Sequence, residues 1–474
     1  MCYTPVMKPD SSETTKKLVL FAATVSSFLS PFTISSTNVA LPTIARQFHM
    51  GAILMTWVPM AYILAGVTLL LPFGKVADIY GRKKVFVYGI ALFTLASLVS
   101  GLALSSSMFI LSMAILGIGG SMVFGTGMAV LLSVYPPSER GKVLGVTIGA
   151  VYVGLSVGPF VGGFLTEQLG WRSIFLVNVP LGLAILGLVL WKLKGEWAEA
   201  AGERFDLVGS VVYCVAIVAV MYGFQMVSQV SGALILSGGV AGLCLFLYWE
   251  TRVRYPILDW SLFRHNRVFA LSNAATFINY SATYALAYLI SLYLQQIKHL
   301  SPQGAGLVMV SQPVMQAIFT PYAGKLSDRV EPQKVASYGM GLTVIGLVAF
   351  AFLSEKTGLP FVVAVLALHG FGFALFSSPN TNAIMGSVEK RYYGVASNIV
   401  SSMRLLGNSF SIGTAMLVFS HYIGEAQITV QNRSAFLVSV RLIFVVFALL
   451  CLIGVFASLA RGKMRSVVSA DMSA

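Results

Sequence analysis

Long apolar stretches are the feature that most constrains how this chain can fold. An α-helix needs about 20 consecutive apolar residues to cross the hydrocarbon core of a bilayer. Such stretches recur fourteen times, at 18–41, 51–73, 85–104, 107–134, 143–166, 174–192, 207–228, 233–249, 268–296, 304–323, 335–353, 359–380, 394–422 and 435–460. Only 10% of the 474 residues are charged, whereas about 25% are charged in soluble domains. The sequence therefore predicts an all-α membrane protein with 14 transmembrane helices.

Lys and Arg residues are distributed unevenly over the segments that connect these stretches. The termini and the connections on their side carry 24 Lys and Arg residues, whereas the connections on the other side carry five. Because cytoplasmic loops of membrane proteins are enriched in Lys and Arg, we expect both termini in the cytoplasm of a multi-pass protein of the cytoplasmic (plasma) membrane. The net charge of +14 then reflects topology, and we expect no nucleic-acid partner.

The residue types that build catalytic or metal sites are not grouped in this sequence. The four cysteines, Cys2, Cys214, Cys244 and Cys451, have no paired spacing. No Ser-His-Asp grouping, metal-ligand spacing or phosphate-binding Gly-rich loop is found in the chain. We therefore expect no enzyme activity, no metal and no cofactor.

A charged segment of twelve residues occurs twice. GKVADIYGRKKV, at 74–85, and GKLSDRVEPQKV, at 324–335, have the same residue at five positions. Repeated six-helix units are typical of transporters that rock one half against the other. We therefore predict a six-helix bundle over 1–192, a linker with two inserted transmembrane helices over 193–267, and a second six-helix bundle over 268–474.

The two charged segments are candidates for a cytoplasmic gate. Asp78 and Asp328 are each expected between the end of one helix and the start of the next, where a carboxylate can cap a helix N-terminus. Such contacts can form in one rocking state and break in the other. Alternatively, the segments only fix the membrane topology. The predicted gate consists of Gly74, Asp78, Gly81, Arg82, Lys83, Gly324, Asp328 and Arg329.

Several motifs resemble one known family. GKVADIYGRKK resembles the loop signature of the major facilitator superfamily, Gly-x-Leu-Ala-Asp-Arg-x-Gly-Arg-Lys, and GLSVGPFVGG resembles the span-five motif of its antiporters. The segments NVALP, WRSIFLVNVPLG, FDLVGS and LYLQ are similar to those of the fourteen-span drug:proton antiporter (multidrug exporter) family. The resemblance implies alternating access, with a bent fifth span at the interface between the halves. The span-five residues are Gly154, Gly158, Pro159, Gly162 and Gly163; close helix packing without a role in transport is the alternative.

The chain departs from this family at positions that the resemblance connects with proton coupling. Thr33 is at the place of an acidic residue before VALP, and Met113 and Leu116 are at the places of an Arg and a Gln in span four. All 17 acidic residues lie outside the middle of the predicted spans. Proton relays in membranes use buried acidic or His side chains. Proton coupling is therefore open, and we do not expect export of simple cations.

Polar residues at helical spacing predict a substrate cavity, because polar faces of membrane helices point to other helices or to water. The candidates are Thr33, Tyr280, Tyr284, His369, Asn380, Arg404 and Asn408. Arg404 either contacts an anionic or strongly polar ligand or braces neighbouring carbonyls and amides. His369 either relays protons or packs in the core. The tyrosines either line the cavity or join helices.

These features together predict a monomeric transporter in the lipid bilayer. Its substrate would be a small amphipathic organic molecule that is neutral, zwitterionic or anionic, exported by alternating access, with protons as an open second partner. One alternative is an uncoupled facilitator or an exporter driven by the gradient of its own substrate. A second alternative is a non-transporting membrane sensor with the same fold.

Overall fold

The computed structural model describes residues 13–135, 140–193, 195–198, 200–227, 230–257, 263, 266–388, 393–424, 426–428 and 430–461, and all regular elements in them are helices. The first seven are α1 (Glu13–Gln47), α2 (Ala52–Tyr80), α3 (Arg82–Gly101), α4 (Ser106–Val134), α5 (Arg140–Gln168), α6 (Arg172–Leu176) and α7 (Asn178–Lys192). We refer to α1–α7 as the first half. The next two helices, α8 (Leu207–Gln225) and α9 (Val230–Glu250), form the hairpin.

The remaining helices form the second half. They are α11 (Arg267–Thr283), α12 (Ala285–Leu292), the π-helical η1 (Tyr293–Ile297), α13 (Pro302–Met309), α14 (Ser311–Arg329), α15 (Pro332–Phe350), α16 (Leu359–Gly386), α17 (Tyr393–Tyr422), the 3₁₀ turn η3 (Val430–Asn432) and α18 (Arg433–Leu459). We call the end of the molecule where α2 and α14 finish the basic end. The other end, where α1 and η1 finish, is the opposite end.

Each of the fourteen predicted stretches lies on one helix or on consecutive helices. Within the described residues, eleven helical segments are long and apolar enough to cross a membrane. The other three stretches lie on α11 with α12, on α13 with α14, and on α17. These helices are interrupted or contain more polar residues, and all of them contribute to the cavity described below.

Local sequence explains where many helices start and bend. Side chains of Ser105, Asp206, Asn266 and Ser301 accept hydrogen bonds from backbone N–H groups in the first turns of α4, α8, α11 and α13. Prolines inside α1 and α2 lack an N–H group, so the carbonyl four residues earlier loses its partner within the helix. Two of these carbonyls, those of Asn38 and Thr68, accept hydrogen bonds from other helices.

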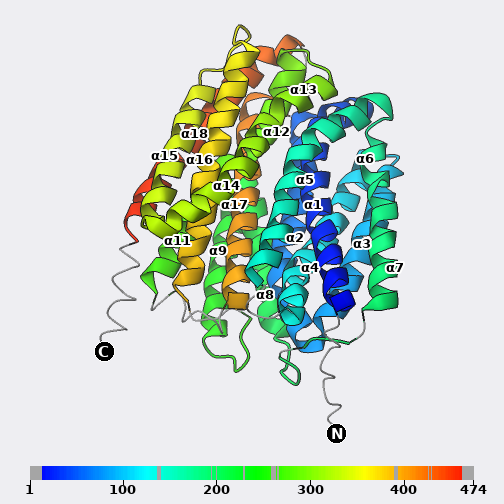
Figure 1. Cartoon of the computed structure of the whole chain (residues 1–474). Coiled ribbons are helices and arrows are strands. Elements are labelled where there is room, and N and C mark those ends of the chain that lie inside the picture. Colours follow the sequence, from blue (N-terminus) through cyan, green and yellow to red (C-terminus); the bar gives the residue numbers. More distant parts are fainter. Residues whose placement is uncertain are drawn as a thin grey trace.

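The hairpin packs between the two halves. Helices α8 and α9 pack along each other, and α8 also contacts α2 of the first half and α17 of the second half. Figure 1 shows α8 beside these two helices at the lower part of the molecule. The hairpin therefore contacts both halves, so a movement of one half against the other must change at least one of these contacts.

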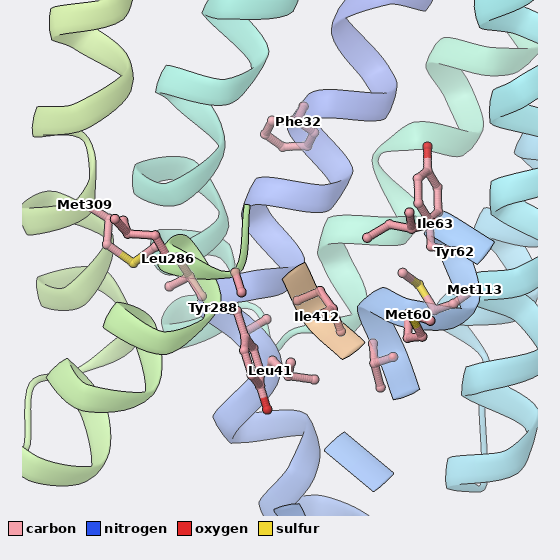
Figure 2. Packing of buried hydrophobic residues seen from close by; sticks show 14 of the residues in the cluster. Phe32, Leu41, Met60, Tyr62, Ile63, Met113, Leu286, Tyr288, Met309 and Ile412 are labelled. Atoms are coloured by element: carbon pink, nitrogen blue, oxygen red, sulfur yellow. The ribbon is translucent and has the colours of Figure 1, made fainter. Parts of the chain in front are cut away.

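One large apolar cluster joins the halves at their centre. It contains Leu41 of α1 and Met60 of α2 together with Leu286 and Tyr288 of α12 and Ile412 of α17, all buried. Figure 2 shows these side chains converging from helices of both halves.

Candidate functional site

A cavity of about 350 Å³ lies between the first and the second half. Residues of α1, α2, α4 and α5 form one wall, and residues of α11 to α14, α16 and α17 form the other. Small-molecule sites in proteins have volumes of about 300–1,000 Å³. Because both halves supply the lining, any rotation of one half against the other changes the shape of the cavity.

The wall of the first half carries polar, uncharged side chains among apolar ones. Ser26, Ser30 and Ser35 of α1 lie on it together with Tyr62 of α2 and Tyr152 of α5. The hydroxyl oxygens of Ser30 and Tyr62 are 2.6 Å apart and form a hydrogen bond. The Ser26 hydroxyl donates to the carbonyl one turn earlier, as hydroxyls in membrane helices commonly do. These hydroxyl groups can replace their present hydrogen bonds by hydrogen bonds to a ligand, and no charged group has to be buried for this.

The wall of the second half contains Tyr280, Tyr284, Arg404 and Asn408, four of the seven residues predicted for the cavity. The Arg404 Nη2 atom donates to Thr381 Oγ1 over 3.0 Å. Its guanidinium carbon lies 5.6 Å from the centre of the Tyr280 ring, a cation–π distance. The described residues that line the cavity include no Asp or Glu.

Arg404 thus has features of both roles that the sequence left open. Its bond to Thr381 braces α17 against α16, and its side chain also lines the cavity. The Tyr280 ring under it is held edge-to-face by Phe373, with ring centres 5.3 Å apart and planes at 77°. An arginine that is fixed by neutral groups keeps its full positive charge for a ligand.

Thr33, His369 and Asn380 do not line this cavity, which corrects the sequence-based assignment. Thr33 Oγ1 accepts a hydrogen bond from Asn178 Nδ2 over 2.9 Å, so it joins α1 to α7. His369 is fully buried on α16, where it packs against Gly346 of α15. The spacing of polar residues identified the right helices, but each helix also has neighbours inside its own half, and these three side chains point to them.

Asn380 belongs to a buried polar group at the basic end that the sequence did not predict. Its Nδ2 atom donates to Thr276 Oγ1 over 2.8 Å, and its Oδ1 atom accepts a hydrogen bond from Arg461. Arg461, only 2% exposed, also donates to Ser272 Oγ over 3.0 Å and to the Ser458 carbonyl over 3.0 Å. Burial lowers the pKa of Arg461 to about 10, so it is charged at neutral pH. It connects α18, α11 and α16.

Other lining residues were missed at the sequence level. Gln312 and Gln316 of α14 lie one helical turn apart on the wall of the second half. Their spacing in an otherwise apolar stretch could have identified them. Tyr62 and Tyr152 carried no such signal, because single tyrosines also anchor membrane helices at the lipid interface.

Hydrogen bonds between the halves close the opposite end of the cavity. Ser291 Oγ donates to the Asn38 carbonyl over 2.7 Å, and Gln295 Nε2 donates to the Val39 carbonyl over 2.8 Å. Pro42 is four residues after Asn38 and cannot donate to that carbonyl within α1. The second half therefore supplies the hydrogen bond that Pro42 removes. The NVALP motif thus provides a free carbonyl to which the second half binds.

The glycines of the span-five motif serve two contacts. Added side chains at Gly154, Gly158 or Gly162 would collide with α1, so these glycines permit the close packing of α1 and α5. An added side chain at Gly163 would collide with backbone at the start of α13. Pro159 lines the cavity, and its carbonyl lies against Gly306 of α13. This face of α5 packs directly on the second half.

The turn between α2 and α3 corrects the role expected for Asp78. Asp78 lies within the last turn of α2, not beyond it, because α2 continues to Tyr80 and ends at Gly81, whose φ is 124°. Its Oδ1 atom accepts a hydrogen bond from Arg82 Nε over 2.8 Å, and it does not cap α3. The segment after α7 caps α3 instead: Arg82 N donates to the Trp197 carbonyl and Lys83 N to Glu196 Oε1, both over 2.8 Å.

The other predicted gate residues lie near the same turns. Gly74 is buried within α2. Gly324 and Arg329 lie within α14, which ends at Val330. The backbone of Asp328 is also inside α14, so it does not precede α15 as expected, and its side chain lies outside the described residues. In the described residues the first turn therefore contacts the α7–α8 connection rather than the second half.

The sequence of the chain is similar to those of known proteins. A sequence profile of the Major Facilitator Superfamily matches residues 23–274 and 272–469. The chain is 29% identical over 446 residues to the riboflavin transporter RibZ of Clostridioides difficile, covering 93% of this chain and 96% of that protein. It is 32% identical over 409 residues to the multidrug resistance protein Stp of Mycobacterium tuberculosis, covering 85% and 75%.

A solved structure has a similar fold. It is a bacterial homolog of the human lysosomal transporter Spinster in an inward-facing and unoccupied conformation. The TM-score is 0.67 at 15% sequence identity, and the likeness covers 97% of this chain and 98% of that one. At this identity the likeness concerns the fold alone.

Proposed function

We propose that this chain, which belongs to the drug-efflux family of the major facilitator superfamily, exports small amphipathic organic molecules by alternating access. Its relatives and structural neighbours are transporters, not enzymes, and the chain is a multi-pass membrane transporter. The observation that carries the proposal is the cavity between the halves, which both halves line and which hydrogen bonds between them close at one end. Transporters of this kind place their substrate at such an interface.

We further infer the topology. Fourteen spans would leave both termini in the cytoplasm, since 24 Lys and Arg residues lie on that side. The basic end then faces the cytoplasm, and the two rocking units are the bundles within 1–192 and 268–474, with 193–267 contributing the hairpin. Because the closed end is the opposite one, we infer an inward-facing state.

The charge of the cavity supports a substrate without net positive charge. Arg404 lies on the wall, and no Asp or Glu is among the described lining residues. A lipophilic cation would meet a like charge there, whereas an anionic or strongly polar group would gain a charge-assisted hydrogen bond. Tyr280, Tyr284 and Phe373 offer aromatic surface to the rest of the molecule. Relatives named for riboflavin transport and for multidrug resistance fit a ring-containing organic substrate.

Energetic coupling is the second part of the proposal. An uncoupled facilitator, or an exporter driven by its substrate gradient, is favoured by a cavity in which the described residues supply no carboxylate and by Thr33, which is bonded to Asn178 instead of facing the cavity. Proton antiport would have to use an unconventional group. His369 is fully buried and does not line the cavity.

Transport from proteoliposomes tests the substrate class. Three probes of comparable size differ in charge: fluorescein as the anion, riboflavin as the neutral molecule and ethidium as the cation. We expect saturable transport of fluorescein and riboflavin and none of ethidium. Arg404→Gln should lower the transport of fluorescein at least about tenfold, which corresponds to about 1.4 kcal/mol, and should affect riboflavin less.

Arg441→Gln is the matched control. Arg441 also lies in a helix of the second half, but its Nε atom donates to the Leu353 carbonyl over 2.6 Å and it does not line the cavity. This variant should keep the charge preference. Saturable ethidium transport would contradict the substrate class. A protein that neither binds nor transports any probe would favour the non-transporting sensor.

A pH gradient and a membrane potential, imposed separately, decide the coupling. Riboflavin is the probe, because a neutral molecule does not itself respond to either gradient. Accumulation of riboflavin against its gradient under a pH gradient alone would identify proton coupling. Riboflavin flux that follows only the concentration gradient would identify a facilitator.

A further inference from the structure

We propose that the hairpin α8–α9 moves with the first half during transport, because residues 193–206 fasten it there, and that the contact between α8 and α17 is the sliding seam. We call the described residues of this segment, 193, 195–198 and 200–206, the strap. The proposal rests on the alternating access proposed above. Four observations carry it: the cap on α3, the ion pair of the strap, the bonds from α8 to α2, and the apolar nature of the contact between α8 and α17.

The strap supplies the N-terminal cap of α3. The Trp197 carbonyl and the Glu196 carboxylate accept hydrogen bonds from the first two N–H groups of α3, over 2.8 Å each. A carboxylate at a helix N-terminus is stabilised by the helix dipole as well as by the hydrogen bond. Gly81 makes room for it, since a side chain there would collide with Glu196. A segment distant in sequence thus completes the signature turn of the first half.

Further contacts tie the strap to the end of α2. Lys75 Nζ and Glu203 Oε2 form an ion pair at 2.6 Å. The backbone N–H of Ala200 donates to the Asp78 carbonyl over 2.9 Å, and Lys83 Nζ donates to the Leu193 carbonyl. Contacts to both helices of one turn hold the strap in a fixed position relative to the first half.

The end of the strap is attached to the hairpin by hydrogen bonds of one residue. Asp206 caps α8, with its Oδ1 atom accepting a hydrogen bond from Gly209 N over 2.9 Å. Its Oδ2 atom accepts another from Trp249 Nε1 of α9, also over 2.9 Å. One carboxylate therefore links the strap to both helices of the hairpin.

Helix α8 is also bonded directly to α2. The Tyr213 hydroxyl donates to the Val67 carbonyl over 3.2 Å, and the Cys214 thiol donates to the Thr68 carbonyl over 3.3 Å. Pro72 leaves the Thr68 carbonyl without its partner inside α2. Inside a membrane a carbonyl without a partner is costly, so separation of α8 from α2 would carry a penalty.

The contact between α8 and α17 is of a different kind. The rings of Phe224 and Phe410 stack with centres 4.4 Å apart and planes at 27°, and Leu405 and Leu406 of α17 pack on the apolar cluster around Tyr213. Apolar contacts are not directional, so the surfaces can shift along each other, as in shear movements between packed helices. When the halves rock, this is the contact that we expect to change.

Two crosslinks test the assignment. In a background with Cys2, Cys244 and Cys451 replaced by alanine and Cys214 by serine, which keeps a donor for the Thr68 carbonyl, one variant carries Lys75→Cys with Glu203→Cys, which joins the strap to α2. The other carries Phe224→Cys with Phe410→Cys, which joins α8 to α17. After bridging with a short bifunctional thiol reagent, we expect the first protein to keep at least about half of its riboflavin transport and the second to lose at least nine-tenths of it. Each unbridged protein is its own control.

The opposite pattern would overturn the proposal: loss of transport when the strap is bridged to α2, or full transport when α8 is bridged to α17. Both unbridged proteins must transport riboflavin for these results to count, and a failure there would count against the proposed function instead. A measurement independent of transport then decides which half the hairpin moves with. Exposed Lys84, Thr251 and Lys325 are replaced by spin-labelled cysteines in pairs.

In the spin-label measurement, the distance between labels at positions 84 and 325 reports the movement of one half against the other. A label at position 251 reports the position of the end of α9. We expect one narrow distance for Thr251 with Lys84 of the first half. We expect a broad or two-component distribution for Thr251 with Lys325 of the second half. A narrow distance to Lys325 combined with a broad one to Lys84 would show that the hairpin travels with the second half.

Discussion

The two copies of the charged segment differ in how each helix turn is held. In the first half, α2 ends at Gly81 with φ at 124°, and the strap caps α3 from outside. In the second half, Val330 ends α14 in an extended conformation, and α15 starts at Pro332 with Glu331 before it and no side-chain cap. The two copies share five residues. They differ at the eighth position, which is Gly81 in the first copy and Glu331 in the second, and this difference determines how the next helix is capped.

The physical cause of the difference is space at this eighth position. Gly81 has no side chain, so it can adopt a positive φ and the Glu196 carboxylate can approach the start of α3. Glu331 has a negative φ of −51°, and Pro332 is already suited to the first position of a helix. The second half is instead held at the basic end by its own Arg461. The first copy of the charged segment thus binds the strap, whereas the basic end of the second half is held by a residue of that half.

The largest effect is expected from Arg461→Gln, which removes the buried cation that holds the basic end of the second half. Its partners Asn380 and Ser272 would lose charge-assisted hydrogen bonds. We expect a loss of about 3 kcal/mol in the free energy of unfolding, measured by SDS titration of purified protein. Arg461→Lys, which keeps the charge but not the forked geometry, should recover only part of it. An unchanged stability would show that the second half is not held in this way.

Gly81→Ala should be the most damaging change in the first turn. A side chain at φ 124° is strained by about 1–3 kcal/mol, and it would also displace the Glu196 carboxylate. We expect a loss of about 2 kcal/mol by the same titration. The second copy has Glu331 at this position, so the control is Gly324→Ala inside α14, which should cost less than half as much because its added carbon would meet only the Ser378 hydroxyl. Equal losses would remove the difference between the turns.

Glu196→Gln should weaken the cap on α3 without a change in shape. The neutral amide can still accept the Lys83 N–H but loses the favourable interaction with the helix dipole. We expect a loss of about 1 kcal/mol, read as a lower thermal midpoint. Glu331→Gln is the comparison in the second half and should lower the midpoint less, because Glu331 at the start of α15 makes no side-chain cap and loses only the interaction with the helix dipole. A larger effect at Glu331 would reverse the comparison.

The smallest effect concerns the ion pair of Lys75 and Glu203. The two side chains are 17% and 32% exposed, and partly exposed ion pairs contribute about 0.2–1 kcal/mol. A double-mutant cycle with Lys75→Gln and Glu203→Gln should therefore give a coupling energy near 0.5 kcal/mol that falls as salt is raised. A coupling energy of zero at low salt would leave the cap on α3 as the main fastening of the strap.

Much of the candidate site could be read from the sequence, and the exceptions have a common cause. The polar faces of α11 and α17 led to Tyr280, Tyr284, Arg404 and Asn408, and these four side chains line one cavity. The same reasoning failed for Thr33, because helix spacing identifies a polar face but not the helix opposite it. In the structure that neighbour is α7, whose Asn178 donates to Thr33.

The sequence by itself determined where the helices lie, because apolar length decides which segments enter the membrane. It also determined which carbonyls are left free, since prolines such as Pro42 and Pro72 remove the donors within their helices. Only the tertiary structure decided which groups fill those places: Ser291 from the other half for Asn38, and Cys214 from the hairpin for Thr68. The reason is that a free carbonyl accepts any donor that packing brings within reach, and packing depends on contacts between residues far apart in the chain.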